Sequence, residues 1–423
     1  MAYHPRILDN ELNELLASLP AIAIEGAKGA GKTETASRRA TTVYMLDDPD
    51  RLALAGADPR RLLRSDPPIL IDEWQRLPET WDLVRRAVDA GAEPGRFLLT
   101  GSASPDGTGR HSGAGRIPTI RMRPLSLVER VGGPGSVSLS ELLEGTRPPL
   151  TGETEMALED YTEEIVASGF PGLRDLSDRA LRTQLDGYLA RIVDRDFAEL
   201  GHELRNPAGL KRWMTAYAAA SSTTASFEKI RDAATGGEGE KPSKRGTAPY
   251  RSVLERLWIL DPVPAWQPTR RHLSRLSASP KHHLADPALA ARLLGASASS
   301  LLENRELGPS IPRDGTLLGA LFESLVTLCV RVYAQAAEAG VGHLRTFSGD
   351  REVDLIVQRQ DGGVVAVEVK LKRTVQDKDC QHLKWLKGKI GDELLDALIV
   401  TTGNAAYRRP DGIAVVPAAL LGA

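Results

Sequence analysis

The stretch that most constrains the fold of this chain lies between residues 26 and 33, where the sequence reads Gly-Ala-Lys-Gly-Ala-Gly-Lys-Thr. It fits the phosphate-loop pattern G-x-x-x-x-G-K-[ST] at every fixed position. An apolar run at 21–24 precedes the loop, and a helix-compatible run at 34–40 follows it. Strand, glycine loop and helix in this order predict an α/β fold, although the alternative is an ordinary glycine-rich turn.

The chemistry of such a loop gives its residues defined roles. Glycines let backbone N–H groups surround phosphate oxygens, and the N-terminus of the following helix adds positive charge at the same point. Lys32 is expected to reach the β- and γ-phosphates of ATP, and the Thr33 hydroxyl is expected to hold Mg²⁺. The predicted nucleotide-binding residues are Gly26, Ala27, Lys28, Gly29, Ala30, Gly31, Lys32, Thr33 and Glu34.

Length and composition limit the other possibilities. A chain of 423 residues is too long for one ordinary core, so two or three domains are expected. The formal net charge is −2, so any affinity for nucleic acid must come from a local patch. Cys329 and Cys380 belong to no Cys or His cluster, which argues against a zinc site or a disulfide framework.

The sequence gives no sign of a targeting or membrane segment. No apolar run approaches the length needed to span a bilayer. The first six residues lack the basic-then-apolar pattern of a signal peptide. A cytoplasmic protein without a membrane partner is therefore expected.

Changes of character along the chain predict three domains, at 1–150, 151–312 and 313–423. The first alternates short apolar strands with helical segments, which predicts a parallel sheet covered by helices. Its strands are expected at 21–24, 42–46, 69–71, 96–100 and 117–122. The second domain is predicted to be helical. The third is expected to have a long helix at 317–339 and strands at 352–357, 364–370 and 397–401.

Acids and hydroxyls at the ends of two predicted strands are candidates for ATP chemistry. Asp72 would enter the Mg²⁺ coordination shell, and Glu73 would polarise the attacking water. The alternative is a pair of surface acids without a role. At the end of the next strand, Thr100 or Ser102 would sense the γ-phosphate or orient the water, or would only cap the following turn.

Two arginines in the following glycine-rich loop are candidates for an arginine finger. Arg110 and Arg116 would act in cis or from a neighbouring copy, and the second case would require a homo-oligomer. The alternative is a solvated basic loop.

These motifs together resemble one family of bacterial and archaeal AAA-type ATPases. The motifs that carry the resemblance are Tyr3-His4-Pro5-Arg6, the phosphate loop, Asp72-Glu73-Trp74-Gln75, Thr100-Gly101-Ser102 and Gly115-Arg116. The match continues through Ser168-Gly169-Phe170-Pro171 and residues 188–196, and so covers nearly the whole chain. It implies ATP binding and hydrolysis, an AAA-like core, a winged-helix middle domain and a C-terminal domain long labelled as of unknown function.

The middle domain carries a local excess of positive charge. The stretch 205–281 holds fourteen Lys or Arg residues against six Asp or Glu. Helices predicted at 227–230 and 248–260 would form a helix-turn-helix followed by a wing, which favours DNA as the partner, or RNA. The alternative is a lid with solvated charged faces. The side chains nearest the nucleic acid would be Tyr250, Arg251, Arg256, Arg270 and Arg271.

The C-terminal domain carries an acidic pattern that is typical of nucleases. Asp354 lies near the start of one predicted strand, and Glu368 and Lys370 lie at the end of the next. Alternate residues of a strand face the same side, so Glu368 and Lys370 point together, and a hairpin brings Asp354 beside them. Glu323 in the long helix would complete the cluster.

This arrangement is the pattern often written PD-(D/E)xK, although Val353 stands where the proline would be. The domain thus resembles the restriction-endonuclease-like fold. Asp354 and Glu368 would hold Mg²⁺, and Lys370 would position or deprotonate water. The alternatives are an exposed charged strand face, or the same fold used for binding without cleavage.

The main hypothesis from sequence is a Mg²⁺- and ATP-dependent enzyme that binds DNA, with DNA cleavage as a candidate second activity. One alternative is a regulatory switch that presents the C-terminal domain to a partner without cleaving it. Another is a motor that remodels duplex or branched DNA. ATP and Mg²⁺ are the expected cofactors in all three.

Overall fold

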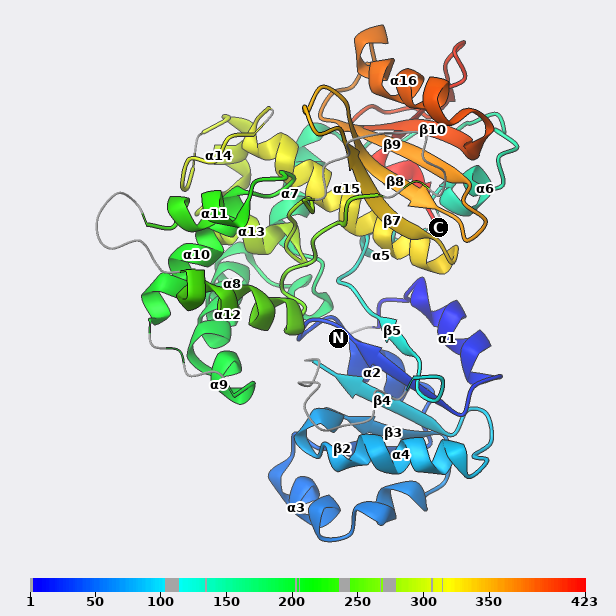
Figure 1. Ribbon diagram of the computed structural model, residues 1–423, viewed down its shortest axis with the longest axis vertical. Coiled ribbons are helices and arrows are strands. Elements are labelled where there is room, and N and C mark those ends of the chain that lie inside the picture. Colours follow the sequence, from blue (N-terminus) through cyan, green and yellow to red (C-terminus); the bar gives the residue numbers. More distant parts are fainter. Residues whose placement is uncertain are drawn as a thin grey trace.

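The computed structural model has three units, which Figure 1 shows in blue and cyan, in green, and in yellow to red. It describes residues 3–102, 114–133, 135–201, 204, 206–235, 244–266, 268, 279–305, 307–313 and 315–423. Arg110, Arg270 and Arg271 therefore lie outside the described residues.

The N-terminal unit is built on a five-stranded parallel sheet. Its strands are β1 (Ala21–Glu25), β2 (Thr42–Met45), β3 (Ile69–Asp72), β4 (Phe97–Gly101) and β5 (Thr119–Arg121). Their order is β2-β3-β4-β1-β5, and every pairing is parallel. In such a sheet the carboxyl ends of all strands meet at one edge, where ligands bind. Each strand overlaps a range predicted from the sequence.

Helices cover both faces of this sheet. They are α1 (Leu8–Leu16), α2 (Lys32–Ser37), α3 (Pro49–Ala57) and α4 (Glu79–Asp89). Successive side chains of β1 point to opposite faces, so Ala23 joins the apolar cluster of Trp81, whereas Ile24 joins that of Leu12. Burial on both faces explains why the strands appear in the sequence as continuous apolar runs.

The middle unit is helical. Its helices include α7 (Leu158–Ala167), α8 (Asp178–Arg191), α9 (Phe197–Glu199), α10 (Pro207–Ala219), α11 (Phe227–Ala233), α12 (Lys244–Arg256), α13 (Pro287–Leu293) and α14 (Ala298–Leu302). A single π-helical segment, Ile192–Asp196, joins α8 to α9. After α12, two isolated antiparallel bridges, Leu260–Leu284 and Val263–Lys281, pair the two arms of an extended segment.

The C-terminal unit packs a long helix against a mixed sheet. The helix is α15 (Leu317–Ala336), and the strands are β7 (Gly340–Arg345), β8 (Glu352–Gln358), β9 (Val364–Lys370), β10 (Leu394–Thr401), β11 (Tyr407–Arg408) and β12 (Ala414–Pro417). Their order is β11-β12-β10-β9-β8-β7. Helix α16 (Gln381–Ile390) connects β9 to β10, which are parallel, whereas β8 is antiparallel to both of its neighbours, β7 and β9.

Among the described residues, α15 is the one helix long and apolar enough to cross a membrane by length and composition, which differs from the expectation from sequence. Its most apolar window is 83% buried inside the protein. The large apolar cluster around α15 also contains Leu289 of α13 and Val367 of β9. The middle and C-terminal units therefore share one continuous core.

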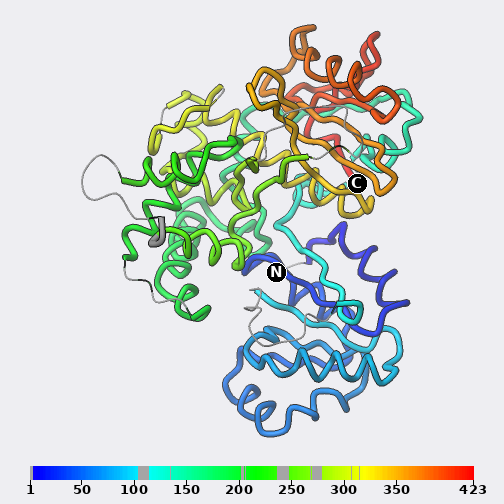
Figure 2. Tube along the Cα trace, in the orientation of Figure 1, coloured from blue at the N-terminus to red at the C-terminus, as the bar shows by residue number. Residues whose placement is uncertain are grey.

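The first predicted domain boundary, at residue 150, differs from the structure. The short strand β6 (Val137–Ser138) pairs with β13 (Leu421–Gly422) at the end of the chain. Helix α6 (Leu139–Leu143) packs against β9, β10 and α15, and Figures 1 and 2 show this cyan-green segment beside the red strands. The apolar face of α6 is buried there, so the N-terminal unit ends near Val131.

Candidate functional site

The phosphate loop connects β1 to α2 at the carboxyl edge of the N-terminal sheet. Two of its glycines are required by the structure. A Cβ on Gly26 would lie 2.1 Å from the carbonyl oxygen of Met122, which follows β5. Gly31 caps α2 with φ +99°, a left-handed conformation that side chains disfavour. The loop thus has the local structure that the sequence predicted.

The lysine of the loop lies buried against its own backbone. Lys32 Nζ donates hydrogen bonds to the carbonyl oxygens of Gly26 at 2.8 Å and Ala27 at 2.9 Å. Burial lowers the pKa of Lys32 to about 8, although the carboxylates of Glu73 and Asp72 act in the opposite direction. These two carbonyls hold the ammonium close to where phosphate oxygens would compete for it.

Asp72, at the end of β3, accepts hydrogen bonds from two hydroxyls. Thr33 Oγ1 of α2 donates to Asp72 Oδ1 at 2.7 Å, and Thr100 Oγ1 of β4 donates to the same oxygen. The sheet order explains the contact, because β4 lies between β3 and β1. A carboxylate and a hydroxyl at the phosphate loop are oxygen ligands of the kind that Mg²⁺ takes, so these residues fit that ion.

Glu73 follows Asp72 and has a left-handed backbone, with φ +53°. This conformation is unusual for a residue with a side chain and is often found at functional sites. Ser102 Oγ donates to Glu73 Oε2 at 2.9 Å, and Gln75 Nε2 donates to the same oxygen. The structure therefore assigns Ser102 a contact with the predicted base, whereas Thr100 contacts the predicted metal ligand.

A cavity of about 600 Å³ opens beside the loop. Lys32, Thr33, Glu34 and Glu73 line it on the N-terminal unit. Residues from the start of the chain and from the middle unit line it as well, namely Tyr3, His4, Arg6, Pro171 and Gly172. The cavity therefore lies between units, so a ligand in it would contact more than the phosphate loop.

Further contacts hold the loop, and the sequence had not assigned a role to any of them. Arg6 is buried and donates to the carbonyl oxygen of Ala30 at 2.8 Å. Lys28 Nζ lies 2.6 Å from Asp196 Oδ1 in the π-helical segment and 3.5 Å from Glu199 Oε2. Tyr188 also donates to the carbonyl oxygen of Lys28, at 3.2 Å. Side chains of the middle unit thus contact the phosphate loop directly.

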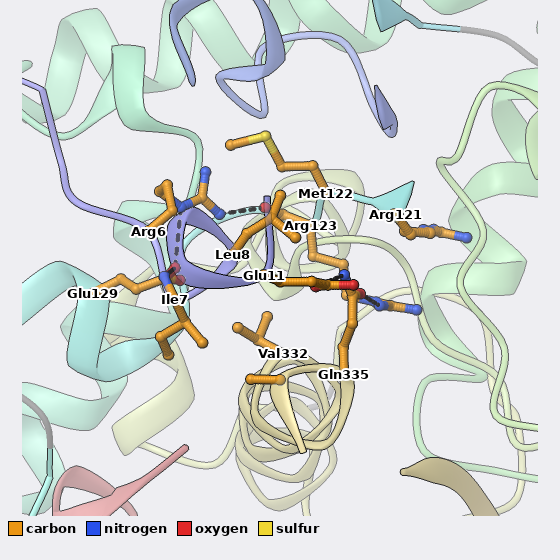
Figure 3. Close-up of a pocket in the computed structure, with 11 residues that line it drawn as sticks. Arg6, Ile7, Leu8, Glu11, Arg121, Met122, Arg123, Glu129, Val332 and Gln335 are labelled. Carbon is orange, nitrogen blue, oxygen red and sulfur yellow. Dashed lines mark hydrogen bonds and ion pairs between the residues drawn. The ribbon is translucent and has the colours of Figure 1, made fainter. Parts of the chain in front are cut away.

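Arg6 also belongs to a cluster of charges where the three units meet. It donates to the carbonyl oxygen of Arg123 at 2.7 Å and pairs with Glu129 at 3.1 Å, as Figure 3 shows. Burial alone would raise the pKa of Asp261, but guanidinium groups including those of Arg121 and Arg123 hold it well below its ordinary value. This network fixes β5 against the segment that follows α12.

The structure does not bring Arg116 to the nucleotide cavity. Its guanidinium pairs with Asp89, at the end of α4, with Nε and Oδ1 2.9 Å apart. Both residues precede strands, so they lie at the amino edge of the parallel sheet, opposite the phosphate loop. A role as a finger within the same chain does not fit this position. A role toward a neighbouring copy stays a prediction.

In the helix predicted to contact nucleic acid, Tyr250 points into the protein, whereas Arg251 is exposed and pairs along the helix. Tyr250 is buried, and Arg251 pairs with Glu255 at 2.7 Å. The Arg251 guanidinium also lies 4.2 Å from the ring centroid of Phe227. The helix ends at Arg256, four residues before the predicted end at 260.

In the C-terminal unit the structure gathers the predicted acidic residues. The backbone N–H of Val369 donates to Asp354 Oδ2 at 2.9 Å, which fixes Asp354 of β8 beside β9. Lys370 Nζ lies 2.6 Å from Glu368 Oε2 and 3.9 Å from Asp354 Oδ2. Burial, followed by the charge of Asp354, raises the pKa of Glu323 to about 8. The hairpin and the long helix meet as the sequence predicted.

A lysine from the middle unit lies at the centre of this cluster. Lys281 Nζ lies 2.9 Å from Glu323 Oε1, 2.9 Å from Glu352 Oε1 and 3.0 Å from Asp354 Oδ1. Burial opposes the charge of Lys281, but these carboxylates raise its pKa well above the ordinary value. Burial likewise opposes ionisation of Asp354, yet the Lys281 ammonium holds its pKa below the usual range.

Comparisons with known proteins assign a class to one unit. Residues 18–131 match the family model of an AAA domain. Residues 158–300 and 318–421 match two families described as domains of unknown function, DUF8612 and DUF4143. The first match and the geometry of the loop together show that the N-terminal unit is similar to AAA domains, a class of P-loop ATPase domains.

Relatives resemble the whole chain more distantly. Uncharacterised proteins of Mycobacterium bovis and Mycobacterium tuberculosis are each 28% identical over 419 residues, which span 96% of this chain and 82% of theirs. Among solved structures, a Walker-type ATPase of Pyrococcus abyssi is similar with a TM-score of 0.40 and 15% identity, over 67% of this chain and 94% of that one.

Proposed function

We propose that this protein is a Mg²⁺-dependent ATPase that works as a nucleotide-operated switch. The observation that carries the proposal is the contact of Asp72 with Thr33 and Thr100 beside the phosphate loop. A phosphate loop, a metal-binding hydroxyl and a strand-end carboxylate are the parts that P-loop ATPases share.

The residues around the phosphate loop have separate roles in ATP binding and hydrolysis. Lys32 exchanges its two carbonyl partners for the β- and γ-phosphates, and Thr33 and Asp72 hold the Mg²⁺ that neutralises phosphate charge. Glu73 accepts a proton from the attacking water, whose oxygen bonds to the γ-phosphorus while the bond to the β-phosphate oxygen breaks. Ser102 and Gln75 orient the Glu73 carboxylate.

The switch is supported by the contacts between the loop and the middle unit. Lys28 lies within the phosphate loop and reaches Asp196, while Tyr188 binds the Lys28 backbone. A ligand that changes the conformation of the loop would also change these contacts with the middle unit. The two states of the loop would therefore favour different positions of that unit.

The ATPase is tested by steady-state hydrolysis and by nucleotide binding in the full chain. Lys32→Ala is expected to remove nearly all turnover and to weaken ATP binding. The matched control is Arg85→Ala, which removes a cation of α4 that pairs with Asp82 and Asp89 away from the residues that line the cavity, and is expected to leave turnover unchanged. Equal loss in both variants, or wild-type turnover in Lys32→Ala, would contradict the proposal.

A second candidate function is cleavage of DNA by the C-terminal unit. It is supported by the gathering of Glu323, Asp354, Glu368 and Lys370 around one point, although Lys281 stands at its centre. The test is nicking of supercoiled and branched DNA in Mg²⁺ or Mn²⁺, with and without ATP. Cleavage that is lost in Asp354→Ala would support a nuclease. Intact DNA binding without cleavage would leave a binding platform, and binding of neither DNA nor RNA would remove nucleic acid as the partner.

A further inference from the structure

We propose that Lys281 is a built-in cation of the C-terminal acidic cluster, and that it keeps divalent metal ions out of this site while the middle unit is docked. The proposal goes beyond the ATPase function and does not depend on it. It departs from the sequence prediction that Asp354 and Glu368 hold Mg²⁺.

The ammonium of Lys281 contacts carboxylates of the cluster on several sides. Its Nζ lies within 3.0 Å of three carboxylates, of Glu323, Glu352 and Asp354, and donates hydrogen bonds to those of Glu323 and Asp354. The residue is completely buried, with 0% of its surface exposed. A buried lysine needs such partners, because an unpaired charge in the interior is very costly. Its positive charge lies among carboxylate oxygens, which are the ligands that a divalent metal ion would also take.

The carboxylates are arranged around this ammonium. Within the described residues, no three His, Cys, Asp or Glu side chains are placed so that they could hold a metal ion. Glu368 Oε2 is taken by Lys370 at 2.6 Å. Glu368 Oε1 is buried and has no hydrogen-bond partner among the described residues, with His382 Nδ1 3.7 Å away. Carboxylate oxygens that could bind a metal ion are present, but Lys281 contacts those of Glu323, Glu352 and Asp354, and Lys370 contacts that of Glu368.

Lys281 reaches the cluster because its own segment is docked on the C-terminal sheet. Its backbone pairs with Val263 in the preceding arm, and this arm continues to a parallel bridge between Ala265 and His343 of the edge strand β7. Trp266 N–H donates to the carbonyl oxygen of His343 at 2.7 Å, and the Trp266 indole donates to Gln358 at 3.3 Å. The lysine can leave the cluster only if this attachment loosens.

The consequence is a site with two states. With Lys281 in place, the four carboxylates of Glu323, Glu352, Asp354 and Glu368 are balanced by ammonium groups and by Arg345, which contacts Glu352 at 2.7 Å. Without Lys281, Glu323, Glu352 and Asp354 would lose the ammonium that they share, although Glu352 keeps Arg345 and Asp354 keeps the Val369 N–H, and a divalent cation is the natural replacement.

The test is Mn²⁺ binding to the full chain without nucleotide, by titration calorimetry and by the electron paramagnetic resonance of the free ion. Lys281→Met keeps the length of the side chain but removes the charge, and is expected to gain a site at least about tenfold tighter than any in the wild type. Lys281→Met/Asp354→Asn is expected to lose it. The control Lys384→Met removes a surface lysine that pairs with Asp411 in the same unit, and should match the wild type.

Two results would overturn the proposal. One is a Lys281→Met protein that folds but gains no Mn²⁺ site. The other is a wild-type protein that binds Mn²⁺ tightly in a way that Asp354→Asn abolishes. The second comparison needs no change at Lys281, so it decides the question even if the variant fails to fold. Because no nucleotide is present, failure of the ATPase proposal would not affect either readout.

Discussion

The molecule contains two acidic centres at the ends of β-strands, and they differ in what balances their charge. In the N-terminal unit, Asp72 contacts only the hydroxyls of Thr33 and Thr100 among its described hydrogen-bond partners, beside a cavity of about 600 Å³. In the C-terminal unit, Asp354 contacts the ammonium of Lys281 and is buried. The first centre is ready to receive a cation, whereas the chain itself supplies the cation of the second.

This difference shows how little a strand-end carboxylate says about metal binding by itself. Both centres place carboxylates near strand ends, Asp72 at the end of β3 and Asp354 near the start of β8, beside the end of β9. They differ in the side chain that contacts the aspartate from outside the sheet. In the first centre it is the hydroxyl of Thr33 in α2, and in the second it is the ammonium of Lys281 in a segment of the middle unit. Four measurements test this difference between the two centres.

The largest expected effect is on stability, from Lys281→Met. Removing the ammonium leaves Glu323, Glu352 and the buried Asp354 without the cation that they share, and breaking a buried ion pair typically costs about 3–5 kcal/mol. Urea unfolding at neutral pH measures the loss, with Lys384→Met, at the surface, expected to keep the wild-type midpoint. If the two variants proved equally stable, Lys281 would not be the cation that the cluster needs.

The next effect is on catalysis at the first centre, around Asp72 and Glu73, which is open because no described residue forms an ion pair with Asp72. Glu73→Gln keeps the size of the side chain and its contact with Ser102, but cannot accept a proton. Turnover of ATP should fall about 100-fold, or about 2.7 kcal/mol in the barrier, with ATP binding nearly unchanged. Glu93→Gln changes an exposed acid of the same unit that does not line the cavity, and should hydrolyse ATP at the wild-type rate. Hydrolysis by Glu73→Gln at that rate would show that Glu73 is not the base.

The fold and the open centre were largely predictable from the sequence because their determinants are local. All five strands of the first sheet are short apolar runs, and the phosphate loop follows the first of them directly. Strand β7 was missed because its sequence, Gly-Val-Gly-His-Leu-Arg, has few apolar residues and two glycines. The boundary at 150 differed because a loop inside the C-terminal unit has the composition of a linker.

The role of Lys281 could not be predicted, because nothing local marks it. It lies 42 residues before Glu323 and 73 before Asp354, and a lysine in an extended segment is normally solvated. The same holds for Arg6 and Asp196, which act on the phosphate loop from distant parts of the chain. Sequence patterns thus identified the residues of both acidic centres but could not tell an open centre from a closed one.

A third measurement uses pH to test the open centre. Burial lowers the pKa of Lys32 to about 8, so the free protein loses this charge as the pH rises from 7 to 9. Phosphate favours the charged lysine, so ATP affinity should fall over this range by up to roughly tenfold, since one pKa unit corresponds to a tenfold change. The matched variant Lys32→Arg stays charged and should bind more weakly but without this slope. The same slope in both proteins would assign the titration to another group.

The smallest effect concerns how the open centre is connected to the rest of the molecule. Asp196→Asn removes the charge that holds Lys28, whereas Glu199→Gln removes a more distant and more exposed partner. ATP should bind Asp196→Asn up to roughly threefold more tightly, because one negative charge beside the phosphate site is gone. Hydrogen exchange should show that ATP protects residues 178–199 in the wild type and in Glu199→Gln, but less in Asp196→Asn. Equal protection in all three would mean that Lys28 does not carry the nucleotide signal, and that the middle unit holds the closed centre in place independently of ATP.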